Sequence, residues 1–178
     1  HLHLPLQAGS DAVLKAMNRH YTVAEYEALI ARLRSRIDGL TVSTDLILGF
    51  PGETEELFEE TMETLKRLNF SHIHAFPYSP RKGTPAATMS GQIDTAEKKR
   101  RVELVNELSA RQKAALLESL VGTKASVLIE TQEGTEGEGF TGNYERVAVS
   151  GLPEGAQRTV VSVALVGTDG KKLLAEAF

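Results

Sequence analysis

The chain has 178 residues, of which 41% are hydrophobic and 25% are charged, and its formal net charge is −4 at pH 7. This composition is that of an ordinary folded protein, and its charge excludes a global attraction to nucleic acid or acidic membranes. The chain contains no cysteine, so it offers no disulfide and no iron–sulfur ligand of its own. It has no apolar run of about 18 residues and no signal-peptide pattern, so we expect a cytoplasmic location without membrane association.

The first part of the chain predicts a strand followed by two helices. Residues 1–6, "HLHLPL", alternate in polarity as a strand does, and Ser10 is a plausible N-cap for a short helix. Thr22 and Glu25 form a capping-box pattern, and the apolar spacing that follows predicts a helix through Ile37. Because the chain starts in mid-strand without methionine, we expect it to be a piece of a longer protein.

Two further strand–turn–helix units follow. Residues 40–48 predict a strand, and the turn "GFPGET" leads into a helix over residues 57–68, with Glu53 expected in its first turn. Residues 71–79, "SHIHAFPYS", predict a third strand, which precedes a loop rich in proline, glycine and threonine. Three such units favour a parallel sheet with crossover helices.

The C-terminal part has a different pattern, with one long helical segment followed by short β-rich runs. A long helix is expected from Asp94 to Leu120, with the basic run "KKRR" near its start and Gly122 after its end. Short β-rich runs follow and predict a small all-β barrel. These runs are residues 125–130, 144–150, 159–167 and 172–178. We therefore predict two domains, residues 1–122 and 123–178.

The turn after the second strand resembles a phosphate-binding loop only superficially. It has no lysine, and Glu53 brings a negative charge to the place where a phosphate would lie. Pro51 also removes one of the N–H donors that an anion site uses. Two interpretations remain, a purely structural corner and a turn that presents its backbone and Phe50 to a flat, neutral ring.

Histidines alternate in "HLH" at residues 1–3 and in "HIH" at residues 72–74, which places each pair on one face of a strand. Such pairs bind zinc in some β/α barrels, but further ligands are needed, and only Asp45 and His20 remain to supply them. We therefore favour a polar barrel interior and predict no metal ligand.

Aromatic and basic residues meet in the segment "HAFPYSPRKGTPAA". Phe76 and Tyr78 beside Arg81 and Lys82 suit a nucleotide base with a nearby phosphate or carboxylate. A core phenylalanine followed by a solvated basic loop is the alternative, and the motif alone leaves both open. In the β-rich part, Asn143 and Tyr144 are candidate RNA contacts, although acidic residues outnumber basic ones there.

Taken together, four segments resemble the radical S-adenosylmethionine methylthiotransferases that modify tRNA. They are "HLHLPLQAGSDAVLKAMNRHYT", "STDLILGFPGETEELFEET", "FPYSPRKGTPAATM" and "GFTGNYERVAV". The resemblance implies an α/β fold: the C-terminal part of a partial β/α (TIM-like) radical-SAM barrel, followed by a small OB-like TRAM barrel. It also implies S-adenosylmethionine and two [4Fe–4S] clusters as cofactors. The cluster cysteines are absent here, so we expect this chain to be inactive alone and to hold no catalytic residue.

The resemblance also implies a reaction and a partner. The segment "HAFPYSPRKGTPAA" is most similar to the MtaB type, which converts N6-threonylcarbamoyladenosine beside the tRNA anticodon into its 2-methylthio derivative. The alternatives are the MiaB type, which modifies isopentenyladenosine in tRNA, and a non-catalytic RNA-binding module. The expected partner is the anticodon stem-loop of tRNA, and no stable protein partner is predicted.

In family terms, several residues are candidates for binding. Those expected at S-adenosylmethionine are Gln7, Ser10, Asp45, Phe50, Phe76 and Tyr78. Those expected at substrate or RNA are Arg19, Arg81, Lys82, Asn143 and Tyr144.

Overall fold

The computed structural model describes all 178 residues, and the chain divides into two compact units. One comprises residues 2–109, here called the parallel unit, and the other comprises residues 110–178 with His1, here called the barrel unit. The division falls inside helix α4 (Thr95–Leu120) because Val105 and Leu108 pack into the first core and Leu117 into the second. The boundary predicted near Gly122 lies between the end of α4 and the first strand of the barrel unit, which begins at Lys124. None of the chain's helices combines the length and the apolar composition that a membrane span requires.

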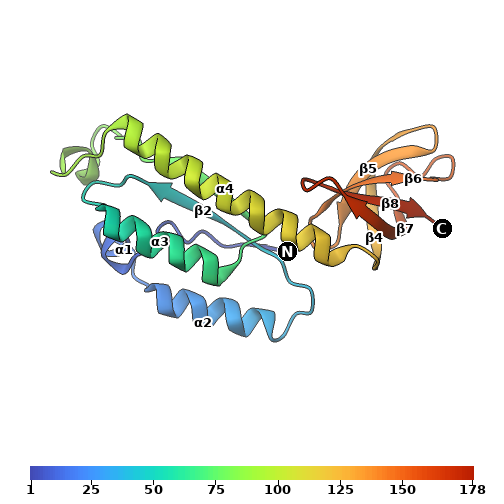
Figure 1. Ribbon diagram of the computed structural model, residues 1–178, viewed down its shortest axis with the longest axis horizontal. Coiled ribbons are helices and arrows are strands. Elements are labelled where there is room, and N and C mark those ends of the chain that lie inside the picture. Colours follow the sequence, from blue (N-terminus) through green and yellow to red (C-terminus); the bar gives the residue numbers. More distant parts are fainter. The chain divides into compact units, whose positions relative to one another are not determined.

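The parallel unit contains a three-stranded sheet in the order β1-β2-β3, and both strand pairs are parallel. Figure 1 labels its central strand, β2. Its strands are β1 (Leu2–His3), β2 (Val42–Leu48) and β3 (His72–Pro77). Its other elements are α1 (Asp11–Ala16), α2 (Val23–Arg34), α3 (Glu55–Leu68), a 3-10 helix (Pro85–Thr88) and the first part of α4. The predicted parallel sheet is thus confirmed.

Two local predictions in this unit need correction. Strand β1 is shorter than residues 1–6 because the Leu6 N–H donates to the Thr44 hydroxyl, at 2.8 Å, and not to a backbone carbonyl of β2. Backbone pairing with β2 resumes at a bridge between Gln7 and Leu46. Helix α2 opens with the predicted capping box, but it ends at Arg34 and leaves Ile37 45% exposed. There the chain tightens into a turn, with the Arg36 N–H bonded to the Leu33 carbonyl at 3.1 Å.

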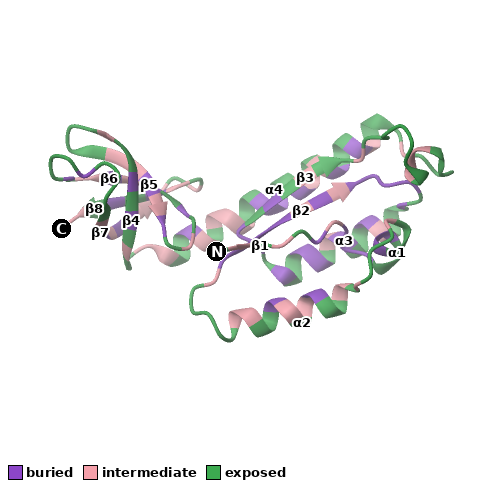
Figure 2. Ribbon diagram, turned by 180° about the vertical axis from the view of Figure 1, so that it is seen from behind, coloured by how far each residue is buried: buried purple, intermediate pink, exposed green.

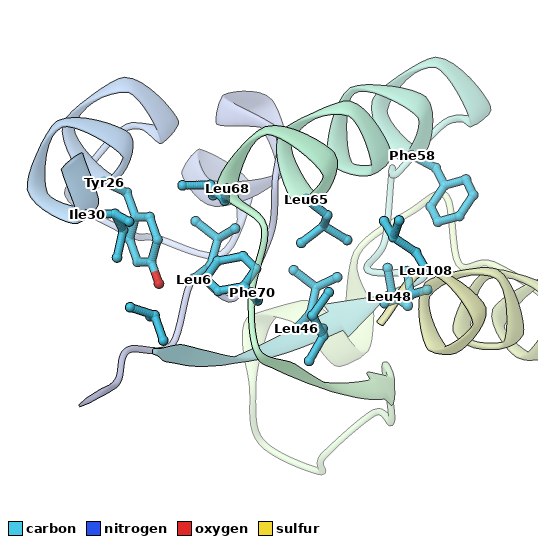
Figure 3. Close-up of a cluster of buried hydrophobic side chains, with 13 residues drawn as sticks. Leu6, Tyr26, Ile30, Leu46, Leu48, Phe58, Leu65, Leu68, Phe70 and Leu108 are labelled. Carbon is cyan, nitrogen blue, oxygen red and sulfur yellow. The ribbon is translucent and has the colours of Figure 1, made fainter. Parts of the chain in front are cut away.

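The core of the parallel unit lies on one face of the sheet. Leu46 and Leu48 point from β2 toward the helices, where Leu46 lies near Leu65 of α3 and Leu48 near Leu108 of α4 (Figure 3). Because successive strand residues point to opposite faces, Asp45 and the residues at matching positions lie on the other face. That other face, here called the open face, is accessible along β3, which Figure 2 shows partly exposed while β2 is mostly buried.

The barrel unit is a closed five-stranded barrel in the order β4-β5-β6-β8-β7. Its strands are β4 (Lys124–Glu133), β5 (Glu136–Thr141), β6 (Arg146–Ser150), β7 (Val160–Thr168) and β8 (Leu173–Ala177). Only β6 and β8 pair in parallel. The predicted fold class, an α/β unit followed by a small OB-like barrel, is confirmed.

The sequence did not predict strand β5, "EGEGFT". Two glycines lower its apparent strand propensity, yet the structure requires them. A Cβ at Gly139 would lie 2.0 Å from the Leu128 carbonyl oxygen, and one at Gly137 would lie 2.5 Å from that of Thr131. The glycines therefore allow β5 to pass closely over the bulge in β4, where the register shifts between Ile129 and Thr131.

Candidate cofactor and substrate site

A cavity of about 660 Å³ lies at the carboxyl ends of β2 and β3. This edge is where ligands bind in parallel α/β sheets. Its lining residues are Gln7, Asp45, Ile47, Phe76, Pro77, Tyr78, Ser79, Arg81, Thr84 and Ala86. The structure thus brings together four of the six residues expected at the cofactor, and it adds Arg81 from the substrate group.

The aromatic side of the cavity is built in two layers. Phe76 is 52% exposed and offers its ring to a ligand. Two neighbours hold the ring of Tyr78 in place. The Phe50 ring packs edge-on against it, with ring centroids 5.1 Å apart, and the Lys98 ammonium lies 5.2 Å from the Tyr78 ring centroid. Phe50 is only 7% exposed and does not line the cavity. The structure therefore gives Phe50 a supporting position rather than one beside a bound ring.

Ser10 also lies away from the cavity. Its hydroxyl donates to Glu60 of α3 at 2.7 Å, and it makes no side-chain cap for α1 although it occupies the N-cap position. The neighbouring Gly9 packs closely on α3, where a Cβ would lie 2.8 Å from the Thr61 Cα. The polar side of the cavity depends instead on Gln7, whose left-handed backbone (φ 70°) brings it to the edge of β2.

The remaining predicted residues lie outside the cavity lining. Arg19 is exposed in the turn after α1, and Lys82 is exposed in the loop after β3. Asn143 and Tyr144 belong to the β5–β6 loop of the barrel unit. There Tyr144 is 62% exposed and stacks on Phe140, with ring centroids 4.9 Å apart and planes at 17°. Such a pair offers a flat surface of the kind on which nucleic-acid bases stack.

The turn between β2 and α3 is held by a buried carboxylate. Glu53 is 1% exposed, and its Oε2 accepts hydrogen bonds from the Gly49 N–H and from Arg101 Nη1, the latter at 2.9 Å. Arg101 also donates to the Glu53 carbonyl at 2.8 Å. The expectation that Glu53 lies in the first helical turn is wrong, because α3 begins at Glu55 after the N-cap Thr54. Glu53 points inward and holds the turn together with Arg101. This Glu53–Arg101 pair is here called the clamp.

Electrostatics at this clamp follow from burial and pairing. Burial raises the pKa of Glu53, while the Gly49 N–H and Arg101 act in the opposite direction. Glu97, which accepts from both Arg100 and Arg101, has its pKa lowered to about 2, mainly by the Arg100 hydrogen bond. Arg101, near the start of α4, thus contacts three carboxylates, those of Glu53, Glu55 and Glu97.

The inward position of Arg101 was missed in the sequence, where "KKRR" reads as a basic run. Lys98 is 9% exposed and Arg101 is 3% exposed. Their positions continue the helical spacing of Val105 and Leu108, which are both in the core. That spacing is the signal in the sequence that distinguishes the inward pair from the outward Lys99 and Arg100.

Comparison with known proteins shows what parts of the chain are similar to. Residues 1–65, which include β1, β2 and the clamped turn, match the family model of the Radical SAM superfamily. Over most of its length the chain is similar to proteins named tRNA-2-methylthio-N(6)-dimethylallyladenosine synthase. The one from Moorella thermoacetica is 46% identical over 142 residues, which is 80% of this chain and 32% of that protein.

Two further relatives with that name give the same result. The protein from Chromobacterium violaceum is 48% identical over 130 residues, covering 73% of this chain and 29% of that protein. The protein from Neisseria meningitidis is 41% identical over 157 residues, covering 86% of this chain and 36% of that protein. The chain therefore spans about a third of the length of the curated relatives it matches.

Proposed function

We propose that this chain forms part of a radical S-adenosylmethionine enzyme that methylthiolates adenosine in tRNA, and that its substrate is N6-dimethylallyladenosine. The observation that carries this proposal is 41–48% identity to the synthases described above. Their shared name favours the isopentenyl-type (dimethylallyl) substrate over the threonylcarbamoyl substrate predicted from "HAFPYSPRKGTPAA". Assignment of residues 1–122 to the radical-SAM core and of residues 123–178 to a TRAM domain is part of the same proposal.

The cavity at the ends of β2 and β3 is proposed to bind the adenosyl part of S-adenosylmethionine. Ile47, Phe76 and Tyr78 offer apolar and aromatic surface to the adenine ring, and Gln7 offers a polar group to the ribose hydroxyls. About 660 Å³ is within the range of small-molecule sites. When bound, this cofactor supplies the methyl and adenosyl groups of the chemistry.

The donor set of this chain does not fit an iron–sulfur cluster, because the chain has no cysteine. We therefore assign none of its residues to cluster binding, and the chain alone is expected to be inactive. Its contribution to tRNA binding is proposed to come from Arg81 and Lys82 beside the cavity and from the Phe140–Tyr144 stack of the barrel unit. Cations of this kind contact phosphates, while stacked aromatics contact unpaired bases.

The cofactor proposal is tested by titrating the ¹⁵N-labelled chain with S-adenosylmethionine and following backbone amide chemical shifts. We expect shifts at Gln7, Ile47 and Tyr78, with weak affinity because no cluster is present to hold the methionine end. Tyr78→Ala should reduce affinity several-fold through lost stacking, whereas Arg19→Ala, outside the cavity lining, should leave it unchanged. Shifts absent from the cavity residues, or insensitive to Tyr78→Ala, would reject this site.

A further inference from the structure

Three side chains with metal-binding groups meet on the open face of the sheet, each from a different strand. They are His3 of β1, Asp45 of β2 and His74 of β3. In the register of β2 and β3, Asp45 stands directly opposite His74, while His3 of β1 pairs with Ser43, two residues before Asp45. Because side chains alternate along a strand, this register puts all three on one face.

The donor atoms are close enough to share one ion. All three lie within 4.8 Å of one another, and His3 Nε2 is 3.3 Å from Asp45 Oδ2. Ligands of a tetrahedral zinc ion, each about 2.0–2.2 Å from the metal, are separated by roughly 3.3 Å. His74 is exposed, so we expect rotation of its side chain to bring its donor atom to that separation.

A neighbouring hydroxyl orients the first of these ligands. Ser43 is 4% exposed, and its Oγ lies 2.9 Å from Nδ1 of His3. This contact leaves Nε2 of His3 directed at Asp45. Metal-bound histidines are usually held in this way by a hydrogen bond to the second ring nitrogen.

We propose that His3, Asp45 and His74 bind one divalent transition-metal ion of the zinc type, with water completing its coordination. Two imidazoles and one carboxylate suit zinc, iron or cobalt rather than magnesium or calcium. The side chains of His3 and Asp45 are 41% and 34% exposed, so an ion and its water ligand have access from solvent. From the sequence we expected no residue to bind a metal. The spacing of residues along the chain did not show that the strand register places these three side chains together.

The test is a calorimetric titration of the full chain, stripped of metal and acetylated at its amino terminus, with zinc chloride. We expect one zinc ion per chain. His3→Gln, Asp45→Asn and His74→Gln should each weaken binding at least about tenfold, as loss of a site's supporting groups typically does. His20→Gln, in the loop after α1, is the matched control and should leave affinity unchanged. Circular dichroism establishes that each variant is folded.

Two results would overturn the proposal. One is the absence of stoichiometric zinc binding. The other is binding that survives Asp45→Asn and His74→Gln but not His3→Gln, since a local chelate of His1 and His3 would then hold the ion. The titration needs neither S-adenosylmethionine nor tRNA. Rejection of the zinc site would therefore leave the methylthiotransferase proposal standing, and rejection of the methylthiotransferase proposal would leave the zinc site standing.

Discussion

Replacing Arg101 with methionine is expected to destabilise the parallel unit by about 3–5 kcal/mol, because it leaves a buried carboxylate without its cation. Glu53 and Arg101 are 1% and 3% exposed, so water cannot replace the lost partner. One Glu53 oxygen, Oε1, already has no hydrogen-bond partner. Urea unfolding followed by helical circular dichroism measures the change.

Two comparison variants separate this effect from a general response to losing charge in α4. Lys99→Met removes an exposed cation of the same run and should change stability by less than about 0.5 kcal/mol. Glu53→Gln combined with Arg101→Met should recover part of the loss, because a buried neutral amide costs less than a buried charge. Equal stabilities for Arg101→Met and Lys99→Met would show that the clamp does not stabilise the fold.

The second large effect is expected in the barrel unit. Gly139→Ala should destabilise it by about 3 kcal/mol or more, since the new Cβ would lie 2.0 Å from a backbone carbonyl oxygen that cannot rotate away. Gly142→Ala is the matched control, because nothing lies within 4 Å of its Cβ, and it should change stability by less than about 0.5 kcal/mol.

Amide hydrogen exchange in β4 and β5 is the measurement for this pair, since it reports on the barrel unit alone. Protection should fall throughout both strands in Gly139→Ala and stay unchanged in Gly142→Ala. Similar protection in the two variants would contradict the close approach of β5 to β4.

Much of the fold follows from local patterns in the sequence. The Thr22–Glu25 capping box is formed, and Asp94 accepts a hydrogen bond from the Glu97 N–H at the start of α4. These helix starts can be predicted from the sequence because each depends on two residues only three positions apart. Strand β5 was missed because its glycines are required by a tertiary contact, which no local propensity records.

The site was predictable in part for the same reason. Gln7 follows β1, Asp45 lies within the central strand β2, and Phe76 and Tyr78 lie at the end of β3, so parallel topology brings them together. The roles of Glu53 and Arg101 could not be read from charge alone, because they are 48 residues apart and pair only in the fold. Likewise, a short segment, "HAFPYSPRKGTPAA", suggested the threonylcarbamoyl substrate, whereas identity over most of the chain favours the dimethylallyl substrate.

The most direct test of the proposed function is the nucleoside composition of tRNA from a host that lacks the 2-methylthio modification. The host would carry the Moorella thermoacetica relative with its matching segment replaced by this chain. Mass spectrometry should then detect 2-methylthio-N6-dimethylallyladenosine, and none with the chain expressed alone. Only unmodified N6-dimethylallyladenosine, from a chimera shown to be folded, would contradict the proposed function, and methylthiolation of threonylcarbamoyladenosine instead would contradict the proposed substrate.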